Sequence, residues 1–124
     1  MTLLAIEHLG KRFGGLQAVD DVGFTLARGA IKAVIGPNGA GKTTLFNLIA
    51  GMLSPSSGAI LFQGQPIHGL QPCQVARRGI ARTFQNIKMF HGMSALENVM
   101  VGRHVRTAVG FFGAMLRTPA CRRE

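Results

Sequence analysis

The feature that most constrains the fold of this chain is a glycine-rich segment, GPNGAGKT, at residues 36–43. It fits the pattern G-x-x-x-x-G-K-[S/T], a phosphate-binding loop when it joins a buried strand to a helix. The preceding run IKAVI, residues 31–35, is typical of a strand buried on both faces of a parallel sheet. After the loop, apolar residues recur at helical spacing, at Leu45, Leu48, Ile49 and Met52. The order strand, glycine loop, helix predicts an α/β fold.

The residue types in this segment suit an anionic phosphate ligand. Gly39 and Gly41 can adopt backbone conformations that turn successive N–H groups inward. The helix that begins near Lys42 directs its free N–H groups and the positive end of its dipole at the same anion. Lys42 adds a full charge that can reach the β and γ phosphates, and the Thr43 hydroxyl can ligate Mg²⁺. The alternative is a glycine-rich turn with a merely exposed lysine, which the two flanking elements disfavour.

Local patterns predict the organisation of the rest of the chain. Apolar runs and alternation predict strands at residues 3–9, 22–26, 59–62 and 80–84. Pro72 suits the first turn of a short helix that ends before Gly79. Ser94 and Glu97 have the spacing of a capping box. This box predicts a helix that continues to about Arg103.

Charge and composition leave a basic binding module as an alternative to the phosphate site. The 124 residues carry a formal net charge of +9 and are 47% hydrophobic, so a disordered basic tail is excluded. Residues 77–124 hold nine basic residues against two acidic ones, without a block of like charge. The chain has no Tyr or Trp to stack on bases, so we expect a solvated basic surface and no nucleic-acid partner.

No targeting, disulfide or metal pattern is visible. Cys73 and Cys121 lack metal-site spacing, and the four histidines show no ligand spacing with each other or with the cysteines. The start of the sequence has no basic lead-in to a long apolar run. The longest membrane candidate, residues 107–116, is much shorter than the roughly 20 residues that a spanning helix needs. We therefore expect a reducing cytosol as the compartment.

Three segments together resemble one family. The loop with the residues after it, GPNGAGKTTL at 36–45, resembles the Walker A segment of the ABC-transporter ATPases. KRFGG at 11–15 and GIARTFQ at 79–85 stand at the matching places. Together with LENV at 96–99, the last of these is most similar to the ATP-binding subunits of branched-chain amino-acid importers. The resemblance covers essentially all of the chain and implies a P-loop NTPase core with an antiparallel β subdomain.

The resemblance also implies a nucleotide site for ATP and Mg²⁺. Phe13 takes the place of the aromatic residue that stacks on adenine, usually Tyr, and keeps its π face. Val19 would pack beside the base, and Gln85 matches the glutamine of the Q-loop. The implied ATP-binding residues are Phe13, Val19, Gly36, Pro37, Asn38, Gly39, Ala40, Gly41, Lys42, Thr43, Thr44 and Gln85.

Two of these residues carry catalytic roles in the resemblance. Lys42 would supply phosphate charge, Gln85 would position water and Mg²⁺, and Thr43 with Gln85 would ligate the metal. An amide oxygen suits a hard cation such as Mg²⁺. From the residues alone, Phe13 could also be a core aromatic and Gln85 a surface polar residue, so both alternatives stay open at this point.

The sequence lacks other segments of the family. It has no LSGGQ-like signature, no Walker B strand ending in Asp and Glu, and no switch His, and the one acid after Glu97 is Glu124. We therefore expect an incomplete domain, the N-terminal half of a subunit. Residues 1–92 would hold the β subdomain and the P-loop core to the Q-loop, and residues 93–124 the truncated start of a helical subdomain. Such a chain should bind ATP and hydrolyse it poorly.

The function implied by the resemblance is ATP-driven uptake of branched-chain, apolar amino acids. The expected partners are transmembrane permease subunits, met through the Q-loop and the helical subdomain, a second ATP-binding subunit, and a periplasmic or extracellular substrate-binding protein. The expected location is cytoplasmic, peripheral on the inner face of the cell membrane. The alternatives are an ATPase subunit of another ABC transporter, a basic binding module, or a non-functional remnant.

Overall fold

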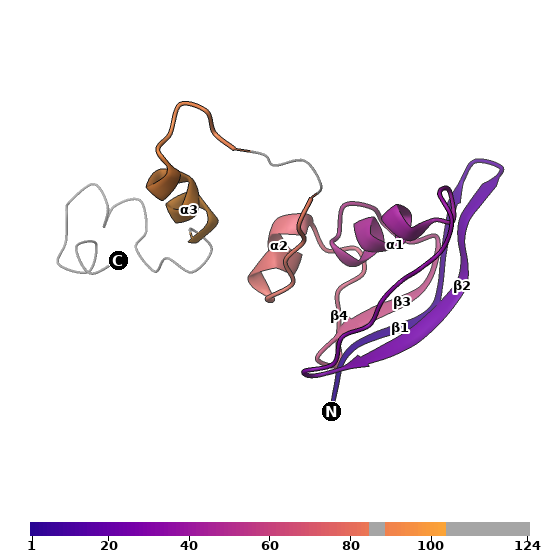
Figure 1. The fold of residues 1–124 in the computed structure, drawn as a ribbon. Helices are drawn as coiled ribbons and strands as arrows, with labels where there is room; N and C mark the ends of the chain where they lie inside the picture. The colour runs from indigo at the N-terminus through magenta and orange to yellow at the C-terminus, as the bar shows by residue number, and fades with distance from the viewer. Residues whose placement is uncertain (85–88, 104–124) are drawn as a thin grey trace. The chain divides into compact units, whose positions relative to one another are not determined.

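The computed structural model describes residues 1–84 and 89–103, and it divides into two units, Met1–Arg82 and Thr83–Glu124 (Figure 1). In the described ranges, the first unit holds a sheet and two helices, and the second holds one helix. Among the described residues, no helix is both long and apolar enough to cross a lipid bilayer.

Four antiparallel strands form the sheet of the first unit. They are β1 (Thr2–Phe13), β2 (Leu16–Ala27), β3 (Ser57–Phe62) and β4 (Gln65–Pro66), and their order in the sheet is β2-β1-β3-β4. The strands predicted at residues 3–9, 22–26 and 59–62 are confirmed, and all three extend further than predicted. β1 and β2 are joined by a tight turn, so the phosphate loop follows a long hairpin in the chain.

An irregularity in β1 changes which side chains are buried. The pairing of β1 with β2 shifts between Ile6 and Leu9, and His8 within the shift has a φ of +48°. Strict alternation from Ile6 would point His8 inward. The bulge instead buries Leu9 completely and leaves His8 exposed.

Helix α1 (Lys42–Ile49) packs its apolar side on the sheet (Figure 1). Leu45 and Leu48 are buried in one core cluster with residues of three strands, as their spacing predicts. The helix ends earlier than its apolar pattern, so Met52 lies beyond it and is 48% exposed. Buried members of the cluster are Leu4, Ile6, Leu9, Val19, Leu45, Leu48, Ile60 and Ile67.

The two shorter predicted helices are also present. α2 (Pro72–Arg77) begins at Pro72 as predicted and buries Val75. α3 (Ala95–Arg103) begins with the predicted capping box. The Ser94 N–H and hydroxyl donate to the Glu97 carboxylate at 2.7 and 2.8 Å, and these bonds hold the pKa of Glu97 below its usual range.

Two predicted strands are wrong for the described residues. Residues 31–35 and 80–84 are not strands, and Ile31 and Ile35 are almost fully exposed instead of buried on both faces. A β-strand has no hydrogen bonds within itself and needs them from neighbouring strands. Within the described ranges, none of the four paired strands bonds to either segment, so their apolar pattern alone does not make them strands.

Candidate functional site

Two glycines shape the loop that leads into α1. Gly39 and Gly41 have φ values of +86° and +83°, in the left-handed region that other residues resist. At Gly41 a Cβ would lie 2.2 Å from the carbonyl oxygen of Ala18, so the loop approaches β2 more closely than any side chain allows. The loop therefore has one backbone path, held against the sheet.

The helix start beside this loop is open to an anion. No side chain caps α1 at Gly41, and its first turn contains no acidic residue. An α-helix leaves its first N–H groups without intrahelical partners, and these groups carry the positive end of the dipole. In the described structure, this end of α1 therefore combines free donors with positive potential, which suits phosphate.

The Lys42 side chain folds back over the loop. Its Nζ donates to the carbonyl oxygens of Gly36 and Pro37, both at 2.6 Å. Among the described residues no carboxylate is paired with this ammonium. Neutral carbonyls are weaker acceptors than phosphate oxygens. Lys42 is thus held over the loop and keeps its net charge for an anionic ligand.

The remaining loop positions leave room for a ligand. Pro37, Asn38 and Ala40 are exposed, Thr43 is exposed in the first turn of α1, and Thr44 is half-buried. In the described ranges there is no group of three or more His, Cys, Asp or Glu residues that could hold a metal ion. A cation here would therefore depend on the Thr43 hydroxyl, ligand oxygens and water, the coordination that Mg²⁺ favours with phosphates.

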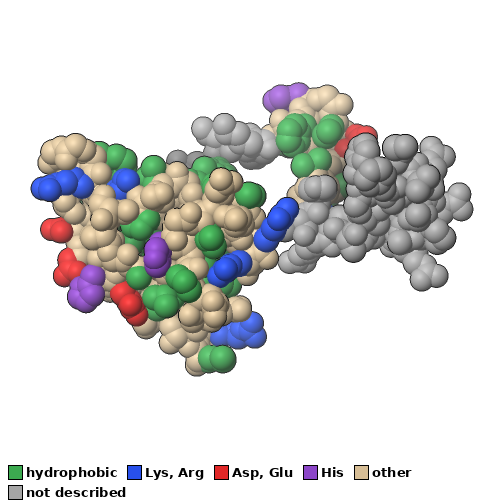
Figure 2. Space-filling model, turned by 180° about the vertical axis from the view of Figure 1, so that it is seen from behind, with side chains coloured by type: hydrophobic (Ala, Val, Ile, Leu, Met, Phe, Trp, Pro, Cys, Tyr) green, Lys and Arg blue, Asp and Glu red, His purple; other side chains and the backbone are tan. Residues whose placement is uncertain are grey.

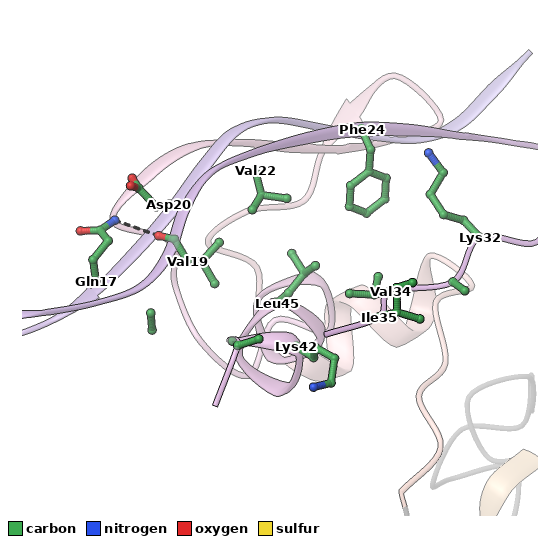
Figure 3. Close-up of a pocket in the computed structure, with 14 residues that line it drawn as sticks. Gln17, Val19, Asp20, Val22, Phe24, Lys32, Val34, Ile35, Lys42 and Leu45 are labelled. Carbon is green, nitrogen blue, oxygen red and sulfur yellow. Dashed lines mark hydrogen bonds between the residues drawn. The ribbon is translucent and has the colours of Figure 1, made fainter. Parts of the chain in front are cut away.

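A pocket of about 580 Å³ lies between β2, residues 32–35 and the start of α1 (Figure 3). Val19 is buried at this pocket, and a Cβ on Gly41 would lie 3.7 Å from its Cγ2, so the structure brings Val19 and the loop together. The lining residues are Gln17, Ala18, Val19, Asp20, Val22, Phe24, Lys32, Ala33, Val34, Ile35, Ala40, Gly41, Lys42 and Leu45.

Phe13 lies elsewhere, at the end of β1. Its side chain is 43% exposed and does not line the pocket beside the loop. The Nζ of Lys11 lies 5.1 Å from the centre of its ring. The alternative of a core aromatic is therefore wrong for Phe13, whereas its predicted role in adenine binding stays a prediction. Gln85 lies outside the described residues.

Sequence reasoning missed Lys11 and Lys32. Each places an ammonium over a phenylalanine ring, Lys11 over Phe13 at 5.1 Å and Lys32 over Phe24 at 5.0 Å. The first pair was detectable, because residues two apart in a strand lie on one face. The second joins β2 to the segment before the loop, and no local pattern indicates it.

The visible face of the first unit shows no continuous basic patch (Figure 2). Its Lys and Arg side chains stand at separate places between neutral and acidic ones (Figure 2). Nucleic-acid backbones are bound by clustered basic residues. This distribution counts against the alternative of a basic binding module on this face.

Most of the chain matches the model of one protein family. A family model described as "ABC transporter" matches residues 19–122. The chain is 45% identical over 121 residues to the high-affinity branched-chain amino acid transport ATP-binding protein LivG of Escherichia coli (strain K12), covering 98% of this chain and 48% of that relative. It is 42% identical over 122 residues to the corresponding protein BraF of Pseudomonas aeruginosa, with the same two coverages. The chain thus spans about half the length of the curated relatives it matches.

Solved structures agree in fold. One is the ADP conformation of an ATP-binding cassette of an ABC transporter, with a TM-score of 0.77 and 32% identity over 96% of this chain and 46% of that one. Another is an ATP-binding subunit of an ABC transporter, with a TM-score of 0.75 and 27% identity over 99% of this chain and 50% of that one. These likenesses confirm the predicted P-loop fold with an antiparallel β subdomain.

Proposed function

The chain belongs to the ABC transporter family, and we propose that it is an ATP-binding part of an importer ATPase subunit. The observation that carries the proposal is the loop before α1. There, Gly41 fits a backbone path that excludes a Cβ, and Lys42 lies over the loop without a carboxylate partner among the described residues. This combination of free N–H groups and one lysine matches the chemistry of a triphosphate.

Roles for the individual residues follow from this arrangement. The N–H groups of the loop and of the first turn of α1 would hold phosphate oxygens, and Lys42 would neutralise the β and γ phosphates. Thr43 would ligate Mg²⁺ through its hydroxyl, and Phe13 and Val19 would contact adenine. Gln85 would ligate Mg²⁺ and orient water, an assignment that depends on the sequence alone. Bound Mg-ATP supplies the phosphoryl group whose transfer to water releases the free energy for transport.

The catalytic power of the 124-residue chain should be low. Phosphoryl transfer depends on groups that position the attacking water and stabilise the developing charge. The sequence contains neither a Walker B acid nor a signature segment. We therefore propose that this chain binds ATP and hydrolyses it slowly by itself.

The proposed transport substrate is a branched-chain amino acid. LivG and BraF, which the chain resembles over nearly its whole length, are named as branched-chain amino acid transport proteins. We propose permease subunits, a second ATP-binding subunit and a substrate-binding protein as partners, and a place on the cytoplasmic face of the membrane. Leucine uptake by cells lacking the gene for this chain tests the assignment, because normal leucine uptake with impaired uptake of another solute would favour a different ABC transporter.

Titration calorimetry with Mg-ATP tests the nucleotide site directly. We expect saturable binding by the wild-type chain, and binding that changes little between low and physiological salt. Strong DNA binding with a steep salt dependence would instead support a basic binding module. A featureless thermal melt with and without Mg-ATP would support a non-functional remnant.

A further inference from the structure

Lys11 contacts the ring that the proposed function assigns to adenine stacking. We propose that Lys11 is a positioning residue that holds Phe13 with one ring face covered and the other open to a purine. This inference rests on the proposed function and adds to it the residue that orients the base-binding ring. The sequence patterns alone assign Lys11 no role in nucleotide binding.

The position of Phe13 makes its ring mobile unless something holds it. Phe13 is the last residue of β1, pairs with Leu16 across a tight turn, and is 43% exposed. Gly14 and Gly15 form the turn, and a Cβ on either would meet nothing within 4 Å in the part of the chain that the structure describes. An exposed ring at such a turn depends on contacts from its own strand.

Lys11 provides that contact through two interactions of one ammonium group. Its Nζ lies 5.1 Å from the centre of the Phe13 ring and donates to the carbonyl oxygen of Ser54 at 2.7 Å. The first distance is within the range of a cation–π interaction, in which the cation lies over the ring face. The second interaction fixes the ammonium itself, so the cation cannot move freely away from the ring.

The segment that carries Ser54 is firmly joined to β1. The Ser56 N–H donates to the Gly10 carbonyl at 2.8 Å, and the Arg12 N–H donates to Ser56 Oγ at 3.0 Å. Gly10 also pairs with Ser57 at the start of β3. Because these bonds tie the Ser54 segment to β1 on both sides of Lys11, the carbonyl that holds the Lys11 ammonium moves together with β1.

This arrangement gives the ring two unequal faces. The Lys11 ammonium covers one face, so a planar ligand stacks on the other. Base–aromatic stacking needs an accessible face and a fixed ring plane, because ordering a mobile side chain costs free energy on binding. Lys11 thus preorganises the Phe13 ring for base stacking. It makes no contact on which phosphate binding depends.

The test compares two ligands and two variants by titration calorimetry. Mg-ATP contains the base, whereas Mg-tripolyphosphate contains only the phosphates. We expect Lys11→Met to weaken Mg-ATP binding by about two- to five-fold, the range of an exposed cation–π interaction, and to leave tripolyphosphate binding unchanged. Lys11→Arg keeps a cation over the ring and should restore most of the ATP affinity.

Arg12→Met is the matched control, since it removes the same charge one residue later in the strand. It should change neither affinity. In a variant that already carries Phe13→Ala, Lys11→Met should have no further effect on ATP binding, because the ring that it positions is gone.

Each outcome separates this inference from the proposed function. Equal losses for ATP and tripolyphosphate in Lys11→Met, or an undiminished effect in the Phe13→Ala background, would overturn the positioning role. If wild-type ATP binds no more tightly than tripolyphosphate, then Phe13 does not stack on adenine and this inference fails, while the phosphate loop stands. If neither ligand binds the folded wild-type chain, the proposed function fails as well.

Discussion

The phosphate loop and the tip of the β1–β2 hairpin are built in opposite ways. At the loop, Gly41 lies so close to the Ala18 carbonyl that no Cβ fits, and Lys42 bonds to the loop's own carbonyls. At the hairpin tip, Phe13 is 43% exposed and is held by the ammonium of Lys11. The loop is thus specified by its backbone and the tip by exposed side chains. Changes to the loop backbone should therefore affect both stability and binding, changes to the Lys42 side chain binding alone, and changes at the tip only base recognition.

The largest expected effect comes from Gly41→Ala. The substitution forces a left-handed residue and places a methyl group against the Ala18 carbonyl oxygen. We expect a loss of about 2–3 kcal/mol in the free energy of unfolding together with loss of ATP binding. Gly39→Ala is the matched control, because its φ is similar but its Cβ would meet nothing within 4 Å. Urea denaturation measures both variants, and equal losses would contradict the close approach at Gly41.

The next largest effect is expected from Lys42→Ala, on binding alone. A hydrogen bond to a charged group contributes about 1.5–3 kcal/mol, so ATP affinity should fall by about 10- to 100-fold. The bonds that Lys42 makes within the protein are to exposed loop carbonyls, so stability should change little. Calorimetry with Mg-ATP measures the loss, and Arg28→Ala controls for the change in net charge. Unchanged ATP binding would exclude the phosphate-loop assignment.

Phe13→Ala should have a smaller effect that is confined to the base. Removing an aromatic partner of a stacked base costs about 1–3 kcal/mol, and an exposed ring such as Phe13 belongs at the lower end of that range, so ATP affinity should fall by roughly 10-fold. Tripolyphosphate affinity should stay unchanged, and Phe13→Tyr should keep ATP affinity because the π face remains. Equal weakening of both ligands would mean that Phe13 stabilises the loop instead of binding adenine.

Gln85→Ala should show the reverse selectivity of Phe13→Ala. We expect the difference in affinity between ATP with Mg²⁺ and ATP with a chelator to shrink, whereas the preference for ATP over tripolyphosphate is kept. Gln85→Glu is the matched variant, because it keeps an oxygen ligand for the metal at this position. A variant Gln85→Ala with a full Mg²⁺ response would remove Gln85 from the metal site.

The smallest expected effect concerns a fully solvated contact, the capping box of α3. The hydrogen bonds from Ser94 lower the pKa of Glu97, so they stabilise the helix start above the unfolded pKa of this carboxyl. That stabilisation is lost as the pH falls through the lowered, folded pKa. An NMR titration of the Glu97 carboxyl should give a pKa below that in Ser94→Ala. An unchanged pKa in Ser94→Ala would contradict the role of the cap.

Features that depend on neighbours in the sequence were predictable. The capping box of Ser94 and Glu97, the start of α2 at Pro72 and the start of α1 after the glycine loop are all confirmed. In each, the hydrogen bonds join residues within one helical turn, so the local sequence contains both partners. The same reasoning predicted the loop and Lys42 as the phosphate end of the site, and this assignment stays a prediction.

Features that need a distant partner were predicted less well. The apolar segment 31–35 has the composition of a buried strand, yet Ile31 and Ile35 are exposed in the described structure. The bulge that buries Leu9 in place of His8 depends on how β1 pairs with β2 and β3. Neither the pairing register nor the presence of a neighbouring strand can be read from a single run of residues.

By itself, the sequence determined the glycine loop and the start of α1, because the glycines and the first residues of the helix are consecutive and act through local backbone geometry. The tertiary structure decided that Val19 lies beside Gly41 and that Lys11 bridges Phe13 and Ser54. The contacts between Val19 and Gly41 and between Lys11 and Ser54 join residues far apart in the chain. The first forms when α1 packs on the sheet, where both share the core, and the second forms when β3 pairs with β1.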